Sequence, residues 1–257
     1  MKSIITLTLL SLLTFFCGQS QHLIVGQEND STLYLKSSSI QKVLIKFPED
    51  YNPQKTYPLL VALHGNGGTA MDMASIFTPF KHEEVILAFP EGQYPRIITE
   101  TIGFSWYFYT NDIKLSKFSD YKTLEQVNDV IDEISAAYKI KNIFIMGFSQ
   151  GASLAYTVGF KTPEKITGVI AVGGNLPMID GRAAIVFSKE IENAKHLNLF
   201  VSRGNRDRSY KKSMYLEQKE YLTKKGFAPT FFEYDGGHFL TPEFLEKVFR
   251  WIGNNTE

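Results

Sequence analysis

The sequence predicts an α/β fold in which helices cover both faces of a mostly parallel, mixed sheet. Apolar runs of strand length alternate along the chain with segments of helical spacing, and this alternation is typical of β-α-β units. Most of these runs are apolar throughout, which indicates strands that are buried on both faces. No linker-like segment interrupts residues 21–257, and 257 residues suffice for one large domain with a substantial core. We therefore predict a single domain over 21–257.

The strands divide into two kinds. Residues 32–35 and 41–47 alternate polar and apolar side chains, and they predict two antiparallel edge strands joined by a Ser-rich turn. Continuous apolar runs predict buried strands at 58–63, 85–89, 142–146, 166–172 and 197–201, with a last strand at 230–234. Residues 91–118 are rich in aromatic side chains and show no clear period, so no element is predicted there.

Four helices follow from spacing and end signals. Leu124, Val127, Val130, Ile131, Ile134 and Tyr138 recur at helical spacing after Asp120, a predicted N-cap. Residues 152–160 predict a buried helix that ends before Pro163. Residues 209–225 predict an amphipathic helix that stops at Gly226. Thr241 and Pro242 supply an N-cap and a proline at the first helical position of a terminal helix through Trp251.

The N-terminus has the pattern of a secretory signal peptide. Lys2 precedes an apolar stretch over 4–16, and Gly18 and Ser20 supply the small residues of a cleavage site. We predict a signal peptide over 1–20 and a secreted or periplasmic protein. Cys17, the only cysteine, leaves a lipid anchor open as an alternative, although Phe15 and Phe16 disfavour it. Cleavage after Ser20 would leave a chain that cannot form a disulfide.

Composition excludes little but points away from two partner classes. The formal net charge is zero and no run of like charge occurs, which gives no indication of binding to nucleic acid or an anionic membrane surface. No phosphate-binding loop and no metal-ligand cluster is apparent, so the sequence predicts no cofactor and no metal.

The strongest functional signal is Gly147-Phe148-Ser149-Gln150-Gly151. It lies between a predicted strand and a predicted helix, the context of a strand-to-helix turn that exposes a nucleophilic serine. Gly147 and Gly151 would remove side chains that otherwise collide across so sharp a turn. Ser149 is therefore the predicted nucleophile.

A serine hydroxyl needs a base within hydrogen-bond reach, and histidine suits that role near neutral pH. His238 follows the last strand, and Gly236 and Gly237 before it allow a loop to fold back over the sheet edge. We predict His238 as the base. His64 also ends a strand, but glycines follow it, so we interpret it as ordering the next loop, with a direct role left open.

The third member should be a carboxylate that accepts the imidazole proton. Asp207 follows the penultimate strand, and the resulting chain order of Ser149, Asp207 and His238 is the order expected for this architecture. Asp235 is the competing candidate, because it lies three residues from His238. Its glycine neighbours indicate a turn instead.

Acyl transfer also requires donors for a developing oxyanion. The backbone N–H of Gln150 lies at the start of the predicted helix and is one candidate. The loop His64-Gly65-Asn66-Gly67-Gly68 offers flexible backbone after a buried strand, and there we predict the N–H of Asn66. An ordinary strand-to-helix turn remains the plainer interpretation of this loop.

With these motifs in place, the chain resembles the α/β-hydrolase superfamily. Within it, residues 40–252 are similar to the small, lidless phospholipase/carboxylesterase family that includes acyl-protein thioesterases. The resemblance rests on residues 63–67, 147–152, 204–207 and 236–238. The family's pocket-lining Ser-Trp-aromatic loop is similar to Ser105-Trp106-Tyr107, which makes Trp106 a candidate substrate contact. Phe108 stands where that loop usually continues with aspartate, and Gly68 stands where an acidic residue often follows in the oxyanion loop.

The segment between Gly174 and His196 is too short for a separate lid domain. An open pocket of this kind favours soluble short-chain or aromatic esters, including esters on polysaccharides. Arg206 and Arg208 flank the predicted acid and could meet an anionic substrate.

We therefore predict a secreted serine carboxylesterase that acts through an acyl-enzyme. Three alternatives stay open: a serine peptidase of the same fold, a thioesterase, and a non-catalytic binding protein on this scaffold. The oligomeric state is not predicted.

Overall fold

The computed structural model describes residues 22–25, 32–35, 40–80, 83–98 and 100–256. The chain divides into two units, residues 1–40 and residues 41–257. In the first unit, β1 (His22–Val25) and β2 (Thr32–Leu35) pair antiparallel, with His22 opposite Leu35. The predicted signal peptide over 1–20 lies outside the described residues.

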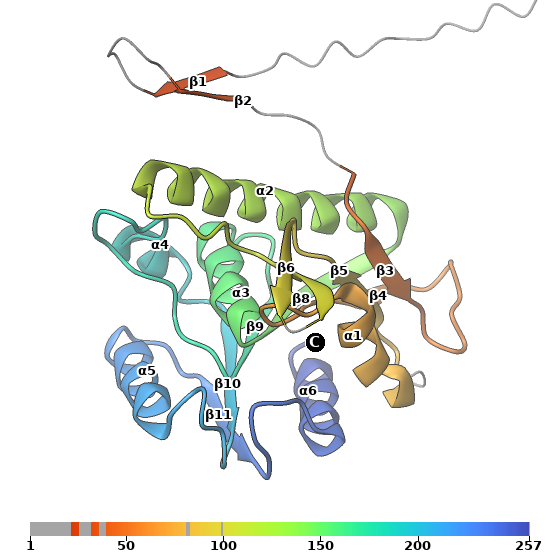
Figure 1. Cartoon of the computed structure of the whole chain (residues 1–257). Coiled ribbons are helices and arrows are strands. Elements are labelled where there is room, and N and C mark those ends of the chain that lie inside the picture. The colour runs from red at the N-terminus through yellow and green to blue at the C-terminus, as the bar shows by residue number, and fades with distance from the viewer. Residues whose placement is uncertain (1–21, 26–31, 36–39, 81–82, 99, 257) are drawn as a thin grey trace, which may run out of the picture. The chain divides into compact units, whose positions relative to one another are not determined.

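The second unit is built on a seven-stranded sheet with the order β11-β10-β9-β8-β4-β5-β3 (Figure 1). All neighbouring pairs are parallel except β3 with β5. The strands are β3 (Val43–Lys46), β4 (Tyr57–Leu63), β5 (Ile86–Pro90), β8 (Ile140–Phe148), β9 (Gly168–Val172), β10 (Asn198–Gly204) and β11 (Thr230–Tyr234). This mixed sheet confirms the predicted fold class.

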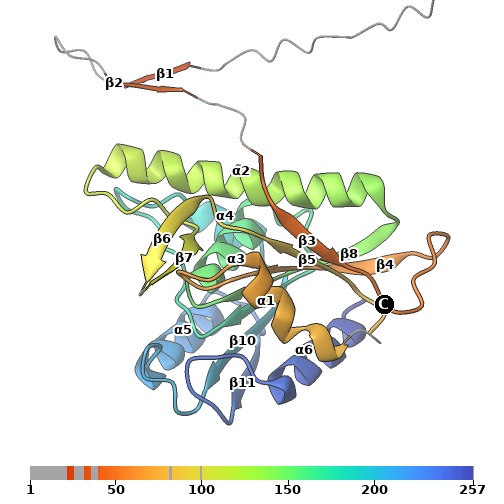
Figure 2. The ribbon, with the colours of Figure 1, turned by 45° about the vertical axis from the view of Figure 1, so that its right-hand side comes forward.

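Helices cover both faces of the sheet (Figures 1 and 2). One face carries α1 (Ala70–Ile76) and α6 (Pro242–Asn254). The other carries α2 (Ile113–Ala137), α3 (Gln150–Lys161), α4 (Ser188–Asn193) and α5 (Lys212–Lys224), and a short 3₁₀ turn, η1, spans Thr78–Phe80. The two cores follow from strand geometry, because alternate side chains of β4 point to opposite faces. Leu59, Val61 and Leu63 join the core under α2 and α3, whereas Leu60 and Ala62 join the core under α1 and α6.

The strand at 41–47 lies at an edge of the sheet, as predicted, but the predicted pairing of the two early strands is wrong. The strand at 32–35 pairs with β1 and not with the strand after it. The strand at 43–46 pairs instead with β5 and alone supplies the antiparallel edge. Amphipathic alternation marks a strand but does not identify its partner, which explains the error.

The long helix begins earlier than predicted. Its N-cap is Asp112, whose carboxylate accepts the backbone N–H groups of Lys114 and Leu115 at 2.9 and 3.2 Å. Asp120 therefore lies inside α2 and caps nothing. The predicted apolar positions from Leu124 to Ile134 are buried, as their spacing indicates.

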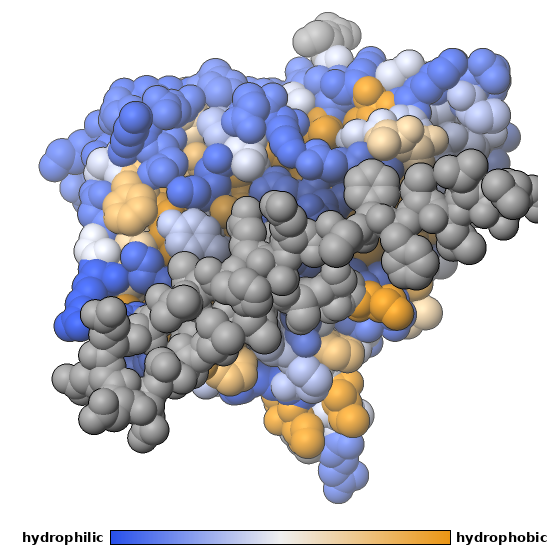
Figure 3. Space-filling view, turned by 90° about the horizontal axis from the view of Figure 1, so that it is seen from above, coloured by the Kyte–Doolittle hydropathy of each residue, from blue (hydrophilic) through white to orange (hydrophobic). Residues whose placement is uncertain are grey.

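The segment without clear period contains an antiparallel hairpin, β6 (Tyr94–Ile98) with β7 (Thr101–Ser105). Its tip exposes isoleucine side chains at 73% for Ile97 and 66% for Ile102. Seen from above, hydrophobic side chains gather on a projection at the lower edge of Figure 3, where the hairpin extends forward in Figure 1.

Candidate active site

Ser149 lies in the sharp turn between β8 and α3. Its φ of 55° and ψ of −114° lie in a region that side chains rarely adopt, so the turn is strained. A Cβ on Gly147 would lie 1.9 Å from the carbonyl oxygen of Gly151, and a Cβ on Gly151 would lie 2.6 Å from that of Leu63. No residue larger than glycine can occupy either position without displacing backbone.

The structure brings Ser149, His238 and Asp207 into one hydrogen-bonded chain. The Ser149 hydroxyl lies 2.9 Å from Nε2 of His238, and Nδ1 of His238 lies 2.7 Å from Oδ2 of Asp207. The three residues follow β8, β11 and β10, whose carboxyl ends meet at the same edge of the sheet. This geometry sets the imidazole tautomer, because Nδ1–H donates to the carboxylate and leaves Nε2 free to accept the hydroxyl proton.

The second oxygen of Asp207 is held by its own loop. Oδ1 accepts the backbone N–H groups of Ser209 and Tyr210, each at 2.8 Å. The carboxylate is almost completely buried, so these bonds replace the water that it loses. The side chain is thus fixed from both sides.

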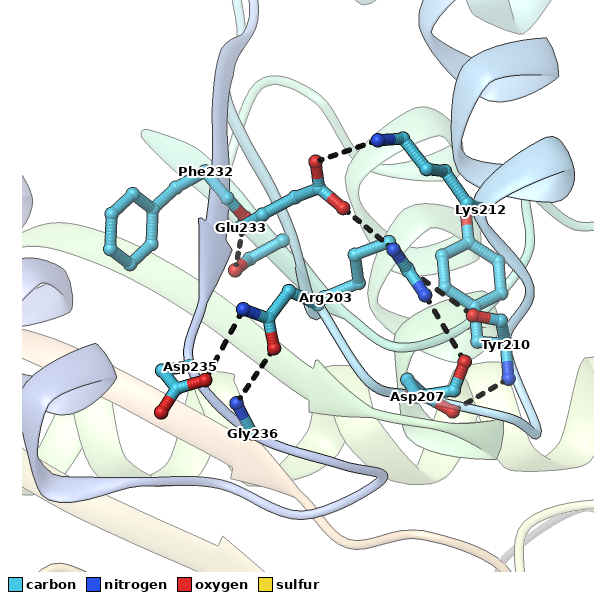
Figure 4. A network of polar contacts seen from close by, with 10 residues as sticks. Arg203, Asp207, Tyr210, Lys212, Phe232, Glu233, Asp235 and Gly236 are labelled. Carbon is cyan, nitrogen blue, oxygen red and sulfur yellow. Dashed lines mark hydrogen bonds and ion pairs between the residues drawn. The ribbon is translucent and has the colours of Figure 1, made fainter.

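Arg203 also stabilises the loop that carries Asp207. The sequence analysis missed this residue. Its guanidinium is 2% exposed and donates to the backbone carbonyls of Asp207 and Tyr210 at 3.1 and 3.3 Å (Figure 4). It also forms an ion pair with Glu233 of β11 at 2.6 Å. The signal that could have found it is an arginine two positions after the apolar run 197–201, because a buried cation requires partners.

The competing carboxylate, Asp235, faces elsewhere. It forms an ion pair with Arg206 and accepts a hydrogen bond from Asn205 at 3.2 Å. The hydrogen bonds from Arg206 and Asn205 lower the pKa of Asp235. Arg206 is thereby paired with a carboxylate rather than presented to an anionic ligand.

The two predicted oxyanion donors, both backbone N–H groups, have no hydrogen-bond acceptor among the described residues. One belongs to Gln150, the first residue of α3, where helix geometry provides no partner. The other belongs to Asn66, in the loop that passes beside the elbow. A Cβ on the neighbouring Gly65 would lie 3.4 Å from Cβ of Ser149.

The hairpin is hydrogen-bonded to this loop. Gly67 N–H donates to the carbonyl of Phe104 at 2.8 Å, and Phe104 N–H donates to Gly68 at 2.9 Å. A Cβ on Gly103 would lie 1.8 Å from the carbonyl oxygen of Gly67, so the two backbones are in direct contact. The segment for which no element was predicted therefore fixes one side of the candidate oxyanion site.

His64 lies apart from the hydrogen-bonded chain at Ser149. Gly92 N–H donates to its Nε2 at 3.0 Å, so Nδ1–H donates to the carbonyl of Gly65 at 2.7 Å. Burial lowers the pKa of His64, which favours this neutral form. The contacts support its interpretation as a residue that orders the loop.

Trp106 does not lie where a substrate contact is expected. It is 0% exposed, stacks on His64 with 4.6 Å between ring centroids, and donates Nε1–H to the carbonyl of His64 at 2.8 Å. It lines neither pocket next to Ser149. The aromatic residues of 91–118 could line a pocket or be buried in the core, and the sequence does not distinguish the two. In the structure, Trp106 is buried and packs against His64.

The side chain of Gln150 joins the elbow to the loop that follows β7. Its Oε1 accepts Trp106 N–H at 2.9 Å, and its Nε2 donates to the hydroxyls of Ser105 and Tyr109, each at 3.0 Å. These bonds fix the loop after β7, which contains Tyr107, Phe108 and Tyr109, to the first residue of α3. The sequence analysis assigned only the backbone of Gln150.

One pocket opens next to Ser149, and a second pocket adjoins it. The first, about 390 Å³, is lined by Ser149, His238, Gly174, Leu176 and Met214, among others. The second, about 280 Å³, lies between the loop after β7 and α2, and the two share Ser153, Pro177 and Met178.

Within the described residues, no three His, Cys, Asp or Glu side chains form a group able to hold a metal ion. None of the described helices combines the length and apolar character needed to cross a membrane.

Comparison with known proteins gives concordant results. The family model described as Phospholipase/Carboxylesterase matches residues 51–255. Carboxylesterase SOBER1 of Arabidopsis thaliana is 25% identical over 202 residues, which are 74% of this chain and 87% of that protein.

Two solved structures share the fold at low sequence identity. Zea mays acyl-protein thioesterase 2 aligns with a TM-score of 0.66 and 16% identity over 84% of this chain and 99% of that chain. The Bacillus cereus carboxylesterase aligns with a TM-score of 0.61 and 20% identity over 84% of this chain and 95% of that chain.

Proposed function

The chain belongs to the phospholipase/carboxylesterase family of hydrolases, and from this premise we propose that it is a serine carboxylesterase that works through an acyl-enzyme. The observation that carries the proposal is the hydrogen-bonded chain from Ser149 through His238 to Asp207 at a strained strand-to-helix turn. These three hydrogen-bonded side chains supply both the nucleophile and the base that acyl transfer requires.

The first half-reaction forms the acyl-enzyme. The Ser149 oxygen attacks the ester carbonyl while Nε2 of His238 takes its proton, and Asp207 stabilises the resulting imidazolium. The carbonyl oxygen gains negative charge, which the N–H groups of Gln150 and Asn66 stabilise. The bond to the alkoxy group then breaks, and His238 returns the proton to the departing alcohol.

The second half-reaction regenerates the free serine. A water molecule takes the place of the alcohol, and His238 removes its proton as its oxygen attacks the acyl carbonyl. The bond to Ser149 breaks, the carboxylic acid leaves, and the proton returns to the serine oxygen.

The size of the pocket supports our proposal for the substrate class. A pocket of about 390 Å³ suits a short acyl or aromatic group, and the segment between β9 and β10 adds no lid domain over it. We therefore propose short-chain and aromatic carboxylic esters as substrates. Thioesters react by the same steps and form the second candidate class, which is motivated by the fold shared with acyl-protein thioesterase 2.

A fluorophosphonate probe combined with 4-nitrophenyl ester hydrolysis tests the mechanism. We expect the intact protein to be labelled and active, and Ser149→Ala to lose both properties. Ser75→Ala, an exposed serine of α1, is the matched control and should retain both. An unlabelled, inactive wild-type protein would indicate a non-catalytic binding protein.

We also propose that the chain is exported and cleaved after Ser20. Support comes from Lys2, the apolar stretch over 4–16, and the small residues Gly18 and Ser20. N-terminal sequencing of the exported protein should give Gln21 as the first residue. A mature chain that begins at Cys17 and carries lipid would instead establish the anchored alternative.

A further inference from the structure

The second pocket, which adjoins the one that holds Ser149, contains a carboxylate that the proposed reaction does not use. Asp120 lies in the N-terminal third of α2 and lines this pocket together with residues of the loop after β7. Because the pocket shares Ser153, Pro177 and Met178 with the one that holds Ser149, a bound ester can extend from one pocket into the other.

Among the described residues, Asp120 forms no ion pair with a positively charged side chain. Its one hydrogen bond within the described part of the chain is a long one, 3.5 Å, from the hydroxyl of Ser119. Other partly buried carboxylates in this protein form ion pairs, for example Glu233 with Arg203 and Glu190 with Lys161. Burial raises the pKa of Asp120 to about 6, so the side chain is an incompletely compensated anion at neutral pH.

The charge acts inside the pocket rather than in bulk solvent. Burial of its hydroxyl raises the pKa of Tyr107, and the carboxylate of Asp120 raises it further. Tyr107 belongs to the loop after β7, which is hydrogen-bonded to the side chain of Gln150.

The remaining walls suit a cation. Tyr107, Phe108 and Tyr109 supply aromatic faces, and Ser116, Ser153 and Thr157 supply hydroxyl oxygens. Aromatic rings and a carboxylate together form the environment in which proteins bind substituted ammonium groups. Tyr109 already carries one cation, since the guanidinium of Arg96 lies 4.2 Å from its ring centroid.

We propose that this pocket binds an ammonium group on the ester substrate, with Asp120 as its counter-ion. The inference rests on the proposed esterase function, because it names the kind of ester that the site prefers. An anionic substituent would be repelled by Asp120. A neutral alkyl substituent would remove the remaining water from a carboxylate that has no partner, which is unfavourable.

Isosteric ester pairs test the proposal. Each pair consists of a trimethylammonium ester and the neutral ester in which carbon replaces nitrogen. Acetylcholine with 3,3-dimethylbutyl acetate probes the alcohol side, with longer homologues of both. The 4-nitrophenyl esters of 4-trimethylammoniobutyrate and 5,5-dimethylhexanoate probe the acyl side.

At about pH 8, where Asp120 is ionised, we expect kcat/KM for the charged member of one series to exceed that of its neutral partner by about tenfold or more. In Asp120→Asn this ratio should fall toward one. Asp129→Asn removes the same charge from the exposed side of α2 and should keep the wild-type ratio. Equal rates within every pair for the wild type, or an unchanged ratio in Asp120→Asn, would overturn the proposal.

A binding measurement separates this proposal from the proposed function. Saturation-transfer NMR with tetramethylammonium chloride needs no catalysis, and we expect a saturable signal in wild type and Asp129→Asn that is lost in Asp120→Asn. If no ester is hydrolysed but this signal behaves as expected, the esterase function fails and the cation site stands. If the signal is absent or insensitive to Asp120→Asn, the cation site fails whatever the esterase assay shows.

Discussion

Arg203 carries a full positive charge into the interior next to the proposed catalytic acid. Its contacts are directional, because one guanidinium reaches the carbonyls of Asp207 and Tyr210 and the carboxylate of Glu233 at once. A guanidinium presents several N–H donors in a fixed plane, which a lysine ammonium cannot reproduce. Arg203 is therefore a positioning residue that acts on His238 through Asp207.

Replacing Arg203 tests this role. In Arg203→Met we expect kcat to fall by roughly 10- to 100-fold with a smaller change in KM, because Asp207 no longer orients His238 firmly. Loss of the buried ion pair should lower the free energy of unfolding by about 3 kcal/mol. Steady-state kinetics and urea unfolding measure the two effects.

Two further variants define the cause. Arg203→Lys should restore little of the rate, whereas Arg250→Met, an exposed arginine of α6, should match the wild type. A wild-type kcat in Arg203→Met would show that the loop keeps its shape without the guanidinium.

Asp120 gives a pH-dependent stability prediction. Its pKa is about 6 in the folded protein against an ordinary value of 3.8, so the folded state loses stability relative to the unfolded state as the pH rises through 6. Asp120→Asn removes this effect. The variant should exceed the wild type by about 1 kcal/mol above pH 6, after allowance for partial exposure, and the difference should vanish below about pH 4.

Urea unfolding of both proteins across this pH range measures the difference. Asp129→Asn should show no such dependence. A gain in Asp120→Asn that persists at low pH would mean that its carboxylate is not the cause.

Sequence reasoning at the residue scale succeeded where one residue type has few alternatives. Ser149, Asp207 and His238 each follow a strand in an order that brings them to one sheet edge, and the predicted hydrogen bonds are present. It failed for Trp106 and did not find Arg203, because burial and partners depend on which chain segments pack together. A pattern within a few neighbouring residues determines neither the burial of a side chain nor its partners.

At the scale of elements, the β6–β7 hairpin supports the loop over 64–68, which contains the proposed oxyanion donor Asn66. Its strand β7 forms two backbone hydrogen bonds with Gly67 and Gly68, and at Gly103 the two backbones touch. The loop is thus fixed by a segment that is distant from it in sequence. Displacement of the hairpin should move the N–H of Asn66.

Gly103→Ala tests this coupling. The added methyl group would lie 1.8 Å from the carbonyl oxygen of Gly67, so the loop or the hairpin must shift. We expect kcat to fall roughly 100-fold, the usual effect of losing one oxyanion donor, while the circular dichroism spectrum stays that of the folded protein. Gly253→Ala meets no atom within 4 Å and is the control, with unchanged kcat. An unaltered rate in Gly103→Ala would separate the hairpin from the oxyanion site.

Elements were predictable where periodicity is strong and less so elsewhere. The apolar strands and the cap at Thr241 follow from local pattern, and the structure has them. The hairpin was missed because its residues lie in three environments, namely solvent at Ile97, the core at Ser105 and backbone contact with the loop at Gly103. The start of α2 was misplaced because Asp120 and Asp112 are both suitable caps, and only tertiary packing decides between them.

On the scale of the whole molecule, residues 41–257 contain both cores and every residue of the proposed site. We therefore expect a chain without residues 1–40 to keep the wild-type thermal midpoint and kcat/KM. A longer deletion through Lys46 also removes β3, which exposes the edge of β5 and should lower the midpoint. Parallel melting and kinetic measurements compare the three proteins. Loss of activity in the shorter deletion would show that residues 1–40 contribute to folding or to the site.

The global arrangement could be predicted because alternating apolar strands and helices permit few topologies. The strand order at the antiparallel edge could not be predicted, since β2 and β3 have the same pattern of side chains and different partners.

The proposed reactive group is divided among the ends of β8, β10 and β11, so no single segment of the chain carries it. Ser149 should therefore stay inert in any partly folded state in which β11 has not yet docked beside β10. When the protein refolds from urea, we expect ester cleavage to appear only after this docking, so the onset of turnover would report when β11 joins the sheet.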